Sequence, residues 1–327
     1  MSLTLADNIL SPPVFLAPLA GITDLPFRDL VASFGAGLVV SEMVASQEMV
    51  QAKPGVRERA ELGFEKANTA VQLAGRDPEW MALAARMVED NGARIIDINM
   101  GCPAKKVVNG YSGSALLKDL DHALTLIEAV VDAVDLPVTL KTRLGWDDDL
   151  LNAPELAKRA EDAGIRMITI HGRTRCQFYK GRADWAAIRA VKDAVSIPVI
   201  ANGDICSADD ARRAMAQSGA DGVMIGRGAQ GRPWLLAQVA ADLFGHTPPH
   251  IPKGRELADM VVAHYQAMLD FYGLDLGLRV ARKHLGWYMD AAGTGSGRRR
   301  TILTQRDPAR VIVELSEAML ESEQEAA

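Results

Sequence analysis

The sequence predicts a (β/α)8 TIM barrel followed by a small C-terminal all-helical domain. Two observations support this prediction. Short apolar runs alternate with longer amphipathic segments eight times between residues 14 and 226, and only helical patterns follow from residue 253 onward. Eight strands alternating with helices are typical of a parallel sheet closed into a barrel of about 250 residues. Alternation alone does not prove closure, so a doubly wound open sheet is the alternative.

The eight predicted strands are short runs rich in Val, Ile and Leu. They cover residues 14–19, 38–42, 69–75, 94–100, 138–144, 167–172, 199–204 and 222–226. The segments between them have helical spacing, as where Trp80 and Met87 fall on one face. Several of these segments end in glycine before the next strand, at Gly92, Gly164 and Gly219, which suits helix C-caps.

The pattern changes after the eighth strand. Residues 245–252 read GHTPPHIP, a linker rich in proline and histidine. We therefore expect a barrel domain over residues 1–247 and a helical domain over residues 248–327. Helices are predicted over 253–272, 277–289 and 307–321, and apolar residues in the first recur at the spacing of a buried stripe.

Composition narrows the functional class. The formal net charge of -6 argues against a chain coated with cations, although it does not exclude a local basic face. Cys102, Cys176 and Cys206 form no CxxC pair and no even disulfide framework, which indicates a reduced compartment and no metal site. The N-terminus lacks the pattern of a signal peptide, and no apolar stretch is long enough to cross a bilayer. We expect a cytoplasmic protein with no membrane partner.

Polar side chains share one face near the ends of four predicted strands. Alternate residues of a strand lie on the same face, and the C-terminal ends of barrel strands form active sites. The polar residues are Gln72, Asp97, Asn99, Thr139, Lys141, Arg143, Thr169 and His171. A solvated strand end would explain any one of them, but four strands with the same polarity favour a functional rim.

The last two strands end in glycine-rich turns, ANGDI at 201–205 and IGRGAQG at 225–231. Backbone N–H groups of such turns bind phosphate, and the loops after the seventh and eighth barrel strands often do so. Gly226, Gly228 and Gly231 also fit GxGxxG, but a Rossmann unit requires a further strand, and the chain enters the linker instead. The turns therefore predict a phosphorylated cofactor, with Lys141 and Gln72 beside it.

Seven segments, in order along nearly the whole chain, resemble the tRNA-dihydrouridine synthase family. They are APLAGITDLPFR, QLAG, INMGCPAKK, KTRLGW, HGRTR, ANGDI and IGRGAQGRPW. NMGCPAKKV and the later RKHLGWY are most similar to the bacterial B-type subgroup. Leu19 stands where many members have methionine, and residues 107–117, VVNGYSGSALL, form a variant loop. The variant loop leaves the subgroup and the target uridine open.

The resemblance implies FMN-dependent reduction of the carbon 5–carbon 6 double bond of a D-loop uridine in tRNA, with NADPH as electron donor. Cys102 would be the general acid that protonates carbon 5, a role that needs the thiol rather than the thiolate. The implied FMN-binding residues are Pro18, Leu19, Ala20, Gln72, Lys141, His171, Asn202, Gly203, Asp204, Gly226 and Arg227. Asp204 would contribute its backbone, because phosphate repels a carboxylate. The implied substrate-binding residues are Asn99, Arg143, Arg173 and Arg175.

A uridine in folded tRNA must be turned out of its stack, so binding energy from elsewhere on the RNA is required. Basic residues are available on the predicted rim loops and in the helical domain: Lys105, Lys106, Arg173, Arg175, Lys180, Arg182, Arg279, Arg282, Lys283, Arg298, Arg299 and Arg300. We expect a monomer that requires no protein partner. Two alternatives stay open: an FMN barrel oxidoreductase acting on a free pyrimidine, and a non-catalytic RNA-binding protein.

Overall fold

The computed structural model describes residues 2–53, 55–56, 58–63 and 68–326, and side chains as far as residue 320. It confirms the predicted barrel, because eight parallel strands pair in the order β4-β3-β11-β10-β9-β8-β7-β6 and β6 pairs back to β4. This closure excludes the open-sheet alternative. The strands are β3 (Val14–Leu16), β4 (Leu38–Val40), β6 (Thr69–Ala74), β7 (Ile95–Asn99), β8 (Val138–Arg143), β9 (Met167–His171), β10 (Val199–Asn202) and β11 (Gly222–Ile225).

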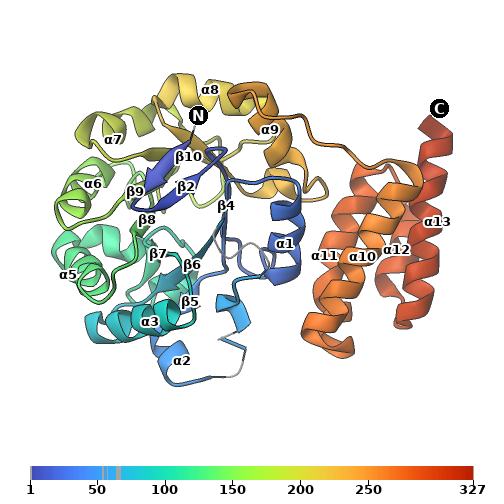
Figure 1. Ribbon diagram of the computed structural model, residues 1–327, viewed down its shortest axis with the longest axis horizontal. Coiled ribbons are helices and arrows are strands. Elements are labelled where there is room, and N and C mark those ends of the chain that lie inside the picture. Colours follow the sequence, from blue (N-terminus) through green and yellow to red (C-terminus); the bar gives the residue numbers. More distant parts are fainter. Residues whose placement is uncertain (1, 54, 57, 64–67, 327) are drawn as a thin grey trace.

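Helices surround the barrel (Figure 1). They are α1 (Leu25–Ser33), α3 (Pro78–Asp90), α5 (Leu120–Val131), α6 (Ala153–Asp162), α7 (Arg189–Ala194), α8 (Ala208–Ser218) and α9 (Leu235–Phe244). Short pieces lie in the loops: β5 (Val44–Ala45), α2 (Ser46–Val50), α4 (Lys105–Val108) and the 3-10 turns η1 (Glu58–Ala60), η3 (Gly113–Lys118), η4 (Ala186–Ile188) and η5 (Arg227–Ala229). Local signals set the helix ends. Ser207 accepts a hydrogen bond from the Asp210 N–H at the start of α8, and Gly219 ends that helix with φ +68°.

The barrel interior has an apolar lower layer and a polar upper layer. Apolar residues that point inward near the strand starts, such as Phe15, Ile95 and Met224, pack with leucines of an N-terminal hairpin. Strands β1 (Leu3–Leu5) and β2 (Asn8–Leu10) form this antiparallel hairpin, which the sequence did not predict. It closes the lower end of the barrel, so chemistry is confined to the opposite rim.

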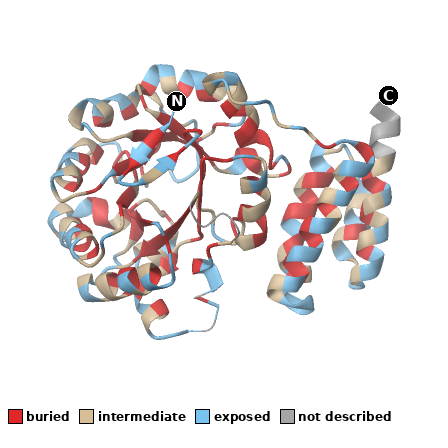
Figure 2. Cartoon of the chain, viewed as in Figure 1, coloured by how far each residue is buried: buried red, intermediate tan, exposed pale blue. Residues whose placement is uncertain are grey.

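Four helices form a second, separate core: α10 (Gly254–Tyr272), α11 (Leu274–Ala291), α12 (Ser296–Thr304) and α13 (Pro308–Ala326). Figure 2 shows buried residues inside the barrel and between these helices, with exposed residues outside. The expected domain boundary at residue 247 falls between α9 and α10. Helix α12 was not predicted, because Ile302 is its one fully buried residue. In the described part of the chain, no helix is both long and apolar enough to cross a membrane.

The helical domain packs against the barrel at the rim where the strands end. The Tyr272 hydroxyl donates to Asp24 Oδ2 at 3.0 Å, and Lys283 Nζ lies 3.4 Å from the Gly21 carbonyl in the loop after β3. In the loop after β11, a Cβ at Gly231 would come within 2.6 Å of the Trp287 carbonyl of α11, so this contact requires glycine. The helical domain therefore extends the rim on which the predicted site lies.

Candidate active site

A chain of hydrogen bonds runs across three neighbouring strands in the upper layer of the barrel. Thr139 Oγ1 donates to Asp97 Oδ1 at 2.6 Å, and Gln72 Nε2 donates to Asp97 Oδ2 at 2.7 Å. The side-chain oxygen Oε1 of Gln72 accepts from Asn99 Nδ2 at 2.7 Å. Asn99 Oδ1 then accepts from the backbone N–H of Cys102 at 3.0 Å. One buried carboxylate therefore fixes the orientation of two amides and, through them, the loop that carries Cys102.

Cys102 is partly exposed at the start of the loop that follows β7. The Ser114 hydroxyl donates to its carbonyl at 2.9 Å, which ties the loop to η3. Burial raises the pKa of the Cys102 thiol, against smaller lowering by its hydrogen bond to the Ala104 backbone and by the nearby charges of Arg143 and Lys141. The thiol is therefore protonated at neutral pH, which is the form that can donate a proton.

Lys141 lies beside Asn99 in the sheet, and its Nζ donates to Asn202 Oδ1 at 3.1 Å. Burial, together with the charge of Arg143, lowers the pKa of Lys141 to about 8, whereas Asp97 and Cys102 act in the opposite direction. The pKa of His171 is lowered well below its usual value, first by burial and then by four surrounding cations. His171 is therefore neutral, and the cations that surround it give the barrel mouth a positive potential.

The Asp204 side chain has partners that the sequence did not predict, while its expected backbone contribution to phosphate binding stays a prediction. Its backbone has φ +54°, and its carboxylate is held by two arginines. Arg173 donates to it through Nη1 at 3.0 Å and Nη2 at 2.5 Å, and Arg227 Nη2 donates to it at 3.1 Å. The Ala183 N–H adds a further bond at 2.8 Å. The side chain therefore neutralises part of the arginine charge and ties the loops after β9, β10 and β11 together.

Two of the predicted substrate residues are buried. Arg173 is 1% exposed, and it donates to the carbonyls of Lys180 and Gly181 as well as to Asp204. Arg143 is 2% exposed and donates to the carbonyls of Gly101, Thr174 and Phe178. Both guanidinium groups therefore order the rim loops, and their contact with the substrate stays a prediction. The sequence could place them at the rim but could not show that backbone carbonyls occupy them.

The other predicted residues are divided between the mouth and its edge. Gln72 is fully buried and hydrogen-bonds to Asn99, so its contact with FMN stays a prediction. Leu19 lies within 3.6 Å of where a Cβ at Gly226 would stand, which brings the loops after β3 and β11 together. Pro18 precedes and Ala20 follows Leu19 in the loop after β3, while Gly203 begins the loop after β10. Arg175 lies outside this group, with its guanidinium carbon 4.7 Å from the centre of the Trp146 ring.

Sequence reasoning missed Tyr179 in the loop after β9. Its ring centre lies 5.4 Å from the guanidinium carbon of Arg143, 5.3 Å from that of Arg227 and 6.3 Å from the His171 ring. Tyr179 is 45% exposed, so an aromatic face borders the cationic mouth. The signal was present in the sequence as adjacent aromatic residues, Phe178 and Tyr179, in a loop otherwise rich in polar residues.

Comparison with known proteins supplies the family. The family model described as "Dihydrouridine synthase (Dus)" matches residues 15–324. A probable tRNA-dihydrouridine synthase of Rhodobacter capsulatus is 62% identical over 328 residues, covering 100% of both chains. The tRNA-dihydrouridine synthase B of Vibrio vulnificus is 50% identical over 289 residues, covering 88% of this chain and 89% of its own.

Two solved structures share the fold at low sequence identity. 2-Naphthoyl-CoA reductase has a TM-score of 0.57 and 14% identity, covering 74% of this chain and 52% of that one. Histamine dehydrogenase from Rhizobium sp. 4-9 has a TM-score of 0.56 and 12% identity, and the match covers 81% of this chain and 50% of that one. The chain spans about half their length, and these likenesses show the barrel fold alone. With the family match over 15–324 and close relatives over the full length, the chain belongs to the dihydrouridine synthase family.

Proposed function

We propose that this protein reduces the carbon 5–carbon 6 double bond of a D-loop uridine in tRNA, with FMN as cofactor and NADPH as electron donor. The observation that carries the proposal is the position of Cys102 at the barrel mouth, where Asn99 Oδ1 accepts from its backbone N–H and the charges of Lys141 and Arg143 lie near its thiol. Family membership agrees with it, since the similar proteins are named tRNA-dihydrouridine synthases.

Cys102 is the proton donor in this proposal. Its raised pKa keeps the proton on sulfur until carbon 5 of the uracil accepts it, and the thiolate left behind lies near Lys141 and Arg143. Asn99 has its carbonyl oxygen engaged with the Cys102 loop and its amide with Gln72. We infer that Asn99 sets the distance between the thiol and the base, because the loop cannot move without breaking this bond.

The charges of the mouth fit a phosphorylated flavin. Lys141, Arg143, Arg173 and Arg227 all lie near enough to His171 to lower its pKa, and the Asp204 carboxylate is shared between two of the arginines. This excess of positive charge suits an anion. The side chain of Arg227 is 54% exposed and so can turn toward a phosphate.

We assign the FMN phosphate to the loops after β10 and β11 and the ring to the loop after β3 and the centre of the mouth. The holding residues would be Pro18, Leu19, Ala20, Lys141, His171, Asn202, Gly203, Gly226 and Arg227, with Gln72 acting through Asn99. When bound, FMN supplies the hydride for carbon 6 of the uracil.

The decisive variant is Cys102→Ala, and the exposed Cys176 provides a matched control. We expect Cys102→Ala to retain FMN and to consume NADPH, yet to form dihydrouridine in tRNA at least a hundredfold more slowly, the usual loss when a general acid is removed. Cys176→Ala should behave as the wild type. Dihydrouridine is measured by mass spectrometry of digested tRNA. Equal product formation by the two variants would remove Cys102 from the mechanism, and a colourless protein that cannot take up FMN would refute the proposal itself.

A further inference from the structure

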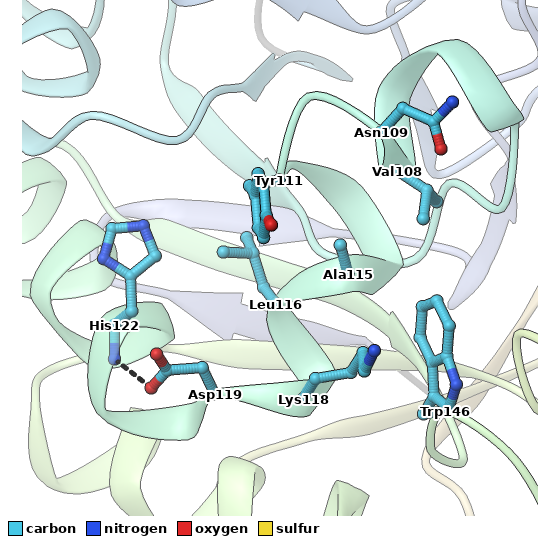
Figure 3. Close-up of a pocket in the computed structure, with 9 residues that line it drawn as sticks. All are labelled: Val108, Asn109, Tyr111, Ala115, Leu116, Lys118, Asp119, His122 and Trp146. Carbon is cyan, nitrogen blue, oxygen red and sulfur yellow. Dashed lines mark hydrogen bonds between the residues drawn. The ribbon is translucent and has the colours of Figure 1, made fainter.

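A pocket of about 470 Å³ lies on the rim beside the Cys102 loop, outside the cationic mouth. Its lining comes from the end of α4 and the segment after it, from η3, from the start of α5 and from the loop after β8 (Figure 3). The lining residues are Val108, Asn109, Tyr111, Ala115, Leu116, Lys118, Asp119, His122 and Trp146. Much of this lining lies in residues 107–117, the segment expected from the sequence to be a variant loop.

The pocket wall is joined to the backbone of Cys102. Both the N–H and the hydroxyl of Ser114 donate to the Cys102 carbonyl, at 3.1 and 2.9 Å. Gly113 packs so closely that an added Cβ would lie 2.8 Å from the same carbonyl oxygen. The position of a ligand in this pocket would therefore be fixed relative to a base that contacts Cys102.

Tyr111 gives the pocket an aromatic side. It is 73% exposed and has φ +54°, a left-handed conformation that is uncommon for a bulky residue and tends to occur at functional sites. Tyr111 lines the pocket together with the apolar residues Ala115 and Leu116 and the ring of Trp146 (Figure 3). An exposed aromatic ring above an apolar floor can stack a nucleobase, and such stacking tolerates any base.

The other side of the pocket is cationic. Lys118 Nζ lies 4.6 Å and the Arg175 guanidinium carbon 4.7 Å from the centre of the Trp146 ring. In the described part of the chain, neither cation has a carboxylate at ion-pair distance. The one lining carboxylate, Asp119, caps α5 by accepting the His122 N–H at 3.0 Å. The pocket thus combines a surface for a base with one lining cation, Lys118, and Arg175 lies next to the lining residue Trp146.

We propose that this pocket binds a nucleotide of the substrate RNA next to the target uridine, with its base against Tyr111 and its phosphate near Lys118 and Arg175. The inference rests on the proposed function. RNA is the source we favour over the adenosine part of NADPH, because the pocket wall is bonded to the proton donor and the exposed Lys105 and Lys106 continue the positive charge along α4. Such a nucleotide would help to hold the uridine in its turned-out position.

The test uses the full chain carrying FMN, with Tyr111→Ala, Tyr111→Phe and a control, Ile9→Ala. Ile9 is 66% exposed on the hairpin at the closed end of the barrel. We expect Tyr111→Ala to raise KM for an unmodified tRNA transcript about tenfold or more, the typical loss of one base–aromatic stack. Tyr111→Phe keeps the stack and should match the wild type, as should Ile9→Ala. KM for NADPH should not change.

A second arm identifies the nucleotide. Transcripts with a single abasic position on either side of the target uridine are assayed with wild type and Tyr111→Ala. With the wild type, one of the two abasic transcripts should raise the tRNA KM as much as Tyr111→Ala raises it for the intact transcript. Combining that abasic transcript with Tyr111→Ala should raise KM no further, because both changes remove the same contact. An unchanged tRNA KM for Tyr111→Ala, fully additive losses at both positions, or a raised KM for NADPH would overturn the inference. Failure of the wild type to form any dihydrouridine would instead refute the proposed function.

Discussion

Substitution of Asp97 would show how a buried charge inside the barrel affects stability and the protonation of Lys141. Asp97 is 3% exposed, and burial raises its pKa, with Thr139, Gln72 and the charge of Lys141 acting in the opposite direction. A carboxyl group whose pKa is higher in the folded than in the unfolded chain stabilises the fold below its unfolded pKa and loses that contribution as pH rises. Ionised Asp97 therefore costs stability at neutral pH.

Asp97→Asn removes the charge but can keep the hydrogen bonds. Its carbonyl can accept from Gln72 Nε2, and its amide can donate to the Thr139 hydroxyl, which then accepts instead of donating. We expect the free energy of unfolding at pH 7 to stay equal or to rise. Asp97→Ala leaves the buried amide of Gln72 without an acceptor, so it should lose about 1–3 kcal/mol for that group and more for the cavity.

The kinetic effect should come through Lys141. In the sheet, Lys141 pairs with Asn99, two residues beyond Asp97, which places the two backbones about 8 Å apart from strand spacing and rise. At an effective dielectric constant of about 20, two unit charges at that distance interact by about 2 kcal/mol, roughly a 30-fold change in a protonation equilibrium. Since the pKa of Lys141 is already about 8, Asp97→Asn should leave it largely neutral at pH 8.

The assay is FMN affinity and the rate of flavin reduction by NADPH, measured from pH 6 to pH 9. Wild type should lose affinity as pH rises through 8, and Asp97→Asn should show the same loss at clearly lower pH. Lys141→Ala should bind FMN weakly at every pH in this range, and its affinity should show no pH-dependent loss. Identical pH profiles for wild type and Asp97→Asn would mean that Asp97 is uncharged in the wild type, and the reasoning would fail.

Two further predictions concern Asp24, where the barrel meets the helical domain, and the arginines of the helical domain. Burial raises the pKa of Asp24 to about 6, so its folding contribution is lost as pH rises from about 4 to 6. Asp24→Asn, which can still cap α1, should raise the free energy of unfolding by up to about 3 kcal/mol at pH 7 and by less than about 1 kcal/mol at pH 4 in urea titrations. Replacing Arg279 and Arg282 by Gln should raise the tRNA KM and flatten its salt dependence. Replacing Arg298 and Arg299 by Gln should change the tRNA KM and its salt dependence less, because these arginines pair with Glu317 and Asp290. Equal effects of the two double variants would contradict this ranking.

The strand positions could be predicted because each strand buries one face against the helices. The predicted range at 94–100 contains β7, where Ile96 and Ile98 pack on the outer helices while Asp97 and Asn99 face the barrel. The hairpin at residues 3–10 escaped prediction for a physical reason. Its strands have three residues each, and its turn passes through Ala6 at φ +50°, without the glycine or asparagine that usually signals such a turn.

The site was predictable in position but not in contacts. Alternation places a residue on a face, so Lys141 and His171 were found, but it does not show which partners occupy a side chain. Arg173 illustrates this difference, because its partners Asp204 and Lys180 come from two separate loops. The role of Asp97 was equally hidden, since its two hydrogen-bond partners lie on the strands to either side. Such contacts arise from the pairing of neighbouring strands and the packing of their loops rather than from any local pattern.

The distribution of charge explains how a chain with a net charge of -6 could bind a polyanion. On the outer helices the basic residues are compensated: Lys158 pairs with Asp162 at 2.7 Å, and Arg213 pairs with Asp210 at 2.5 Å. At the rim, in the part of the chain that the structure describes, Lys105 and Arg182 have no such partner, and the same holds for Lys106, Lys118 and Lys180. Paired cations contribute little to long-range attraction, whereas unpaired cations beside a docked helical domain direct a polyanion to one face. The acidic total and a basic rim are therefore compatible, because the net charge sums over the whole chain, whereas a polyanion responds to the potential of the face on which it docks.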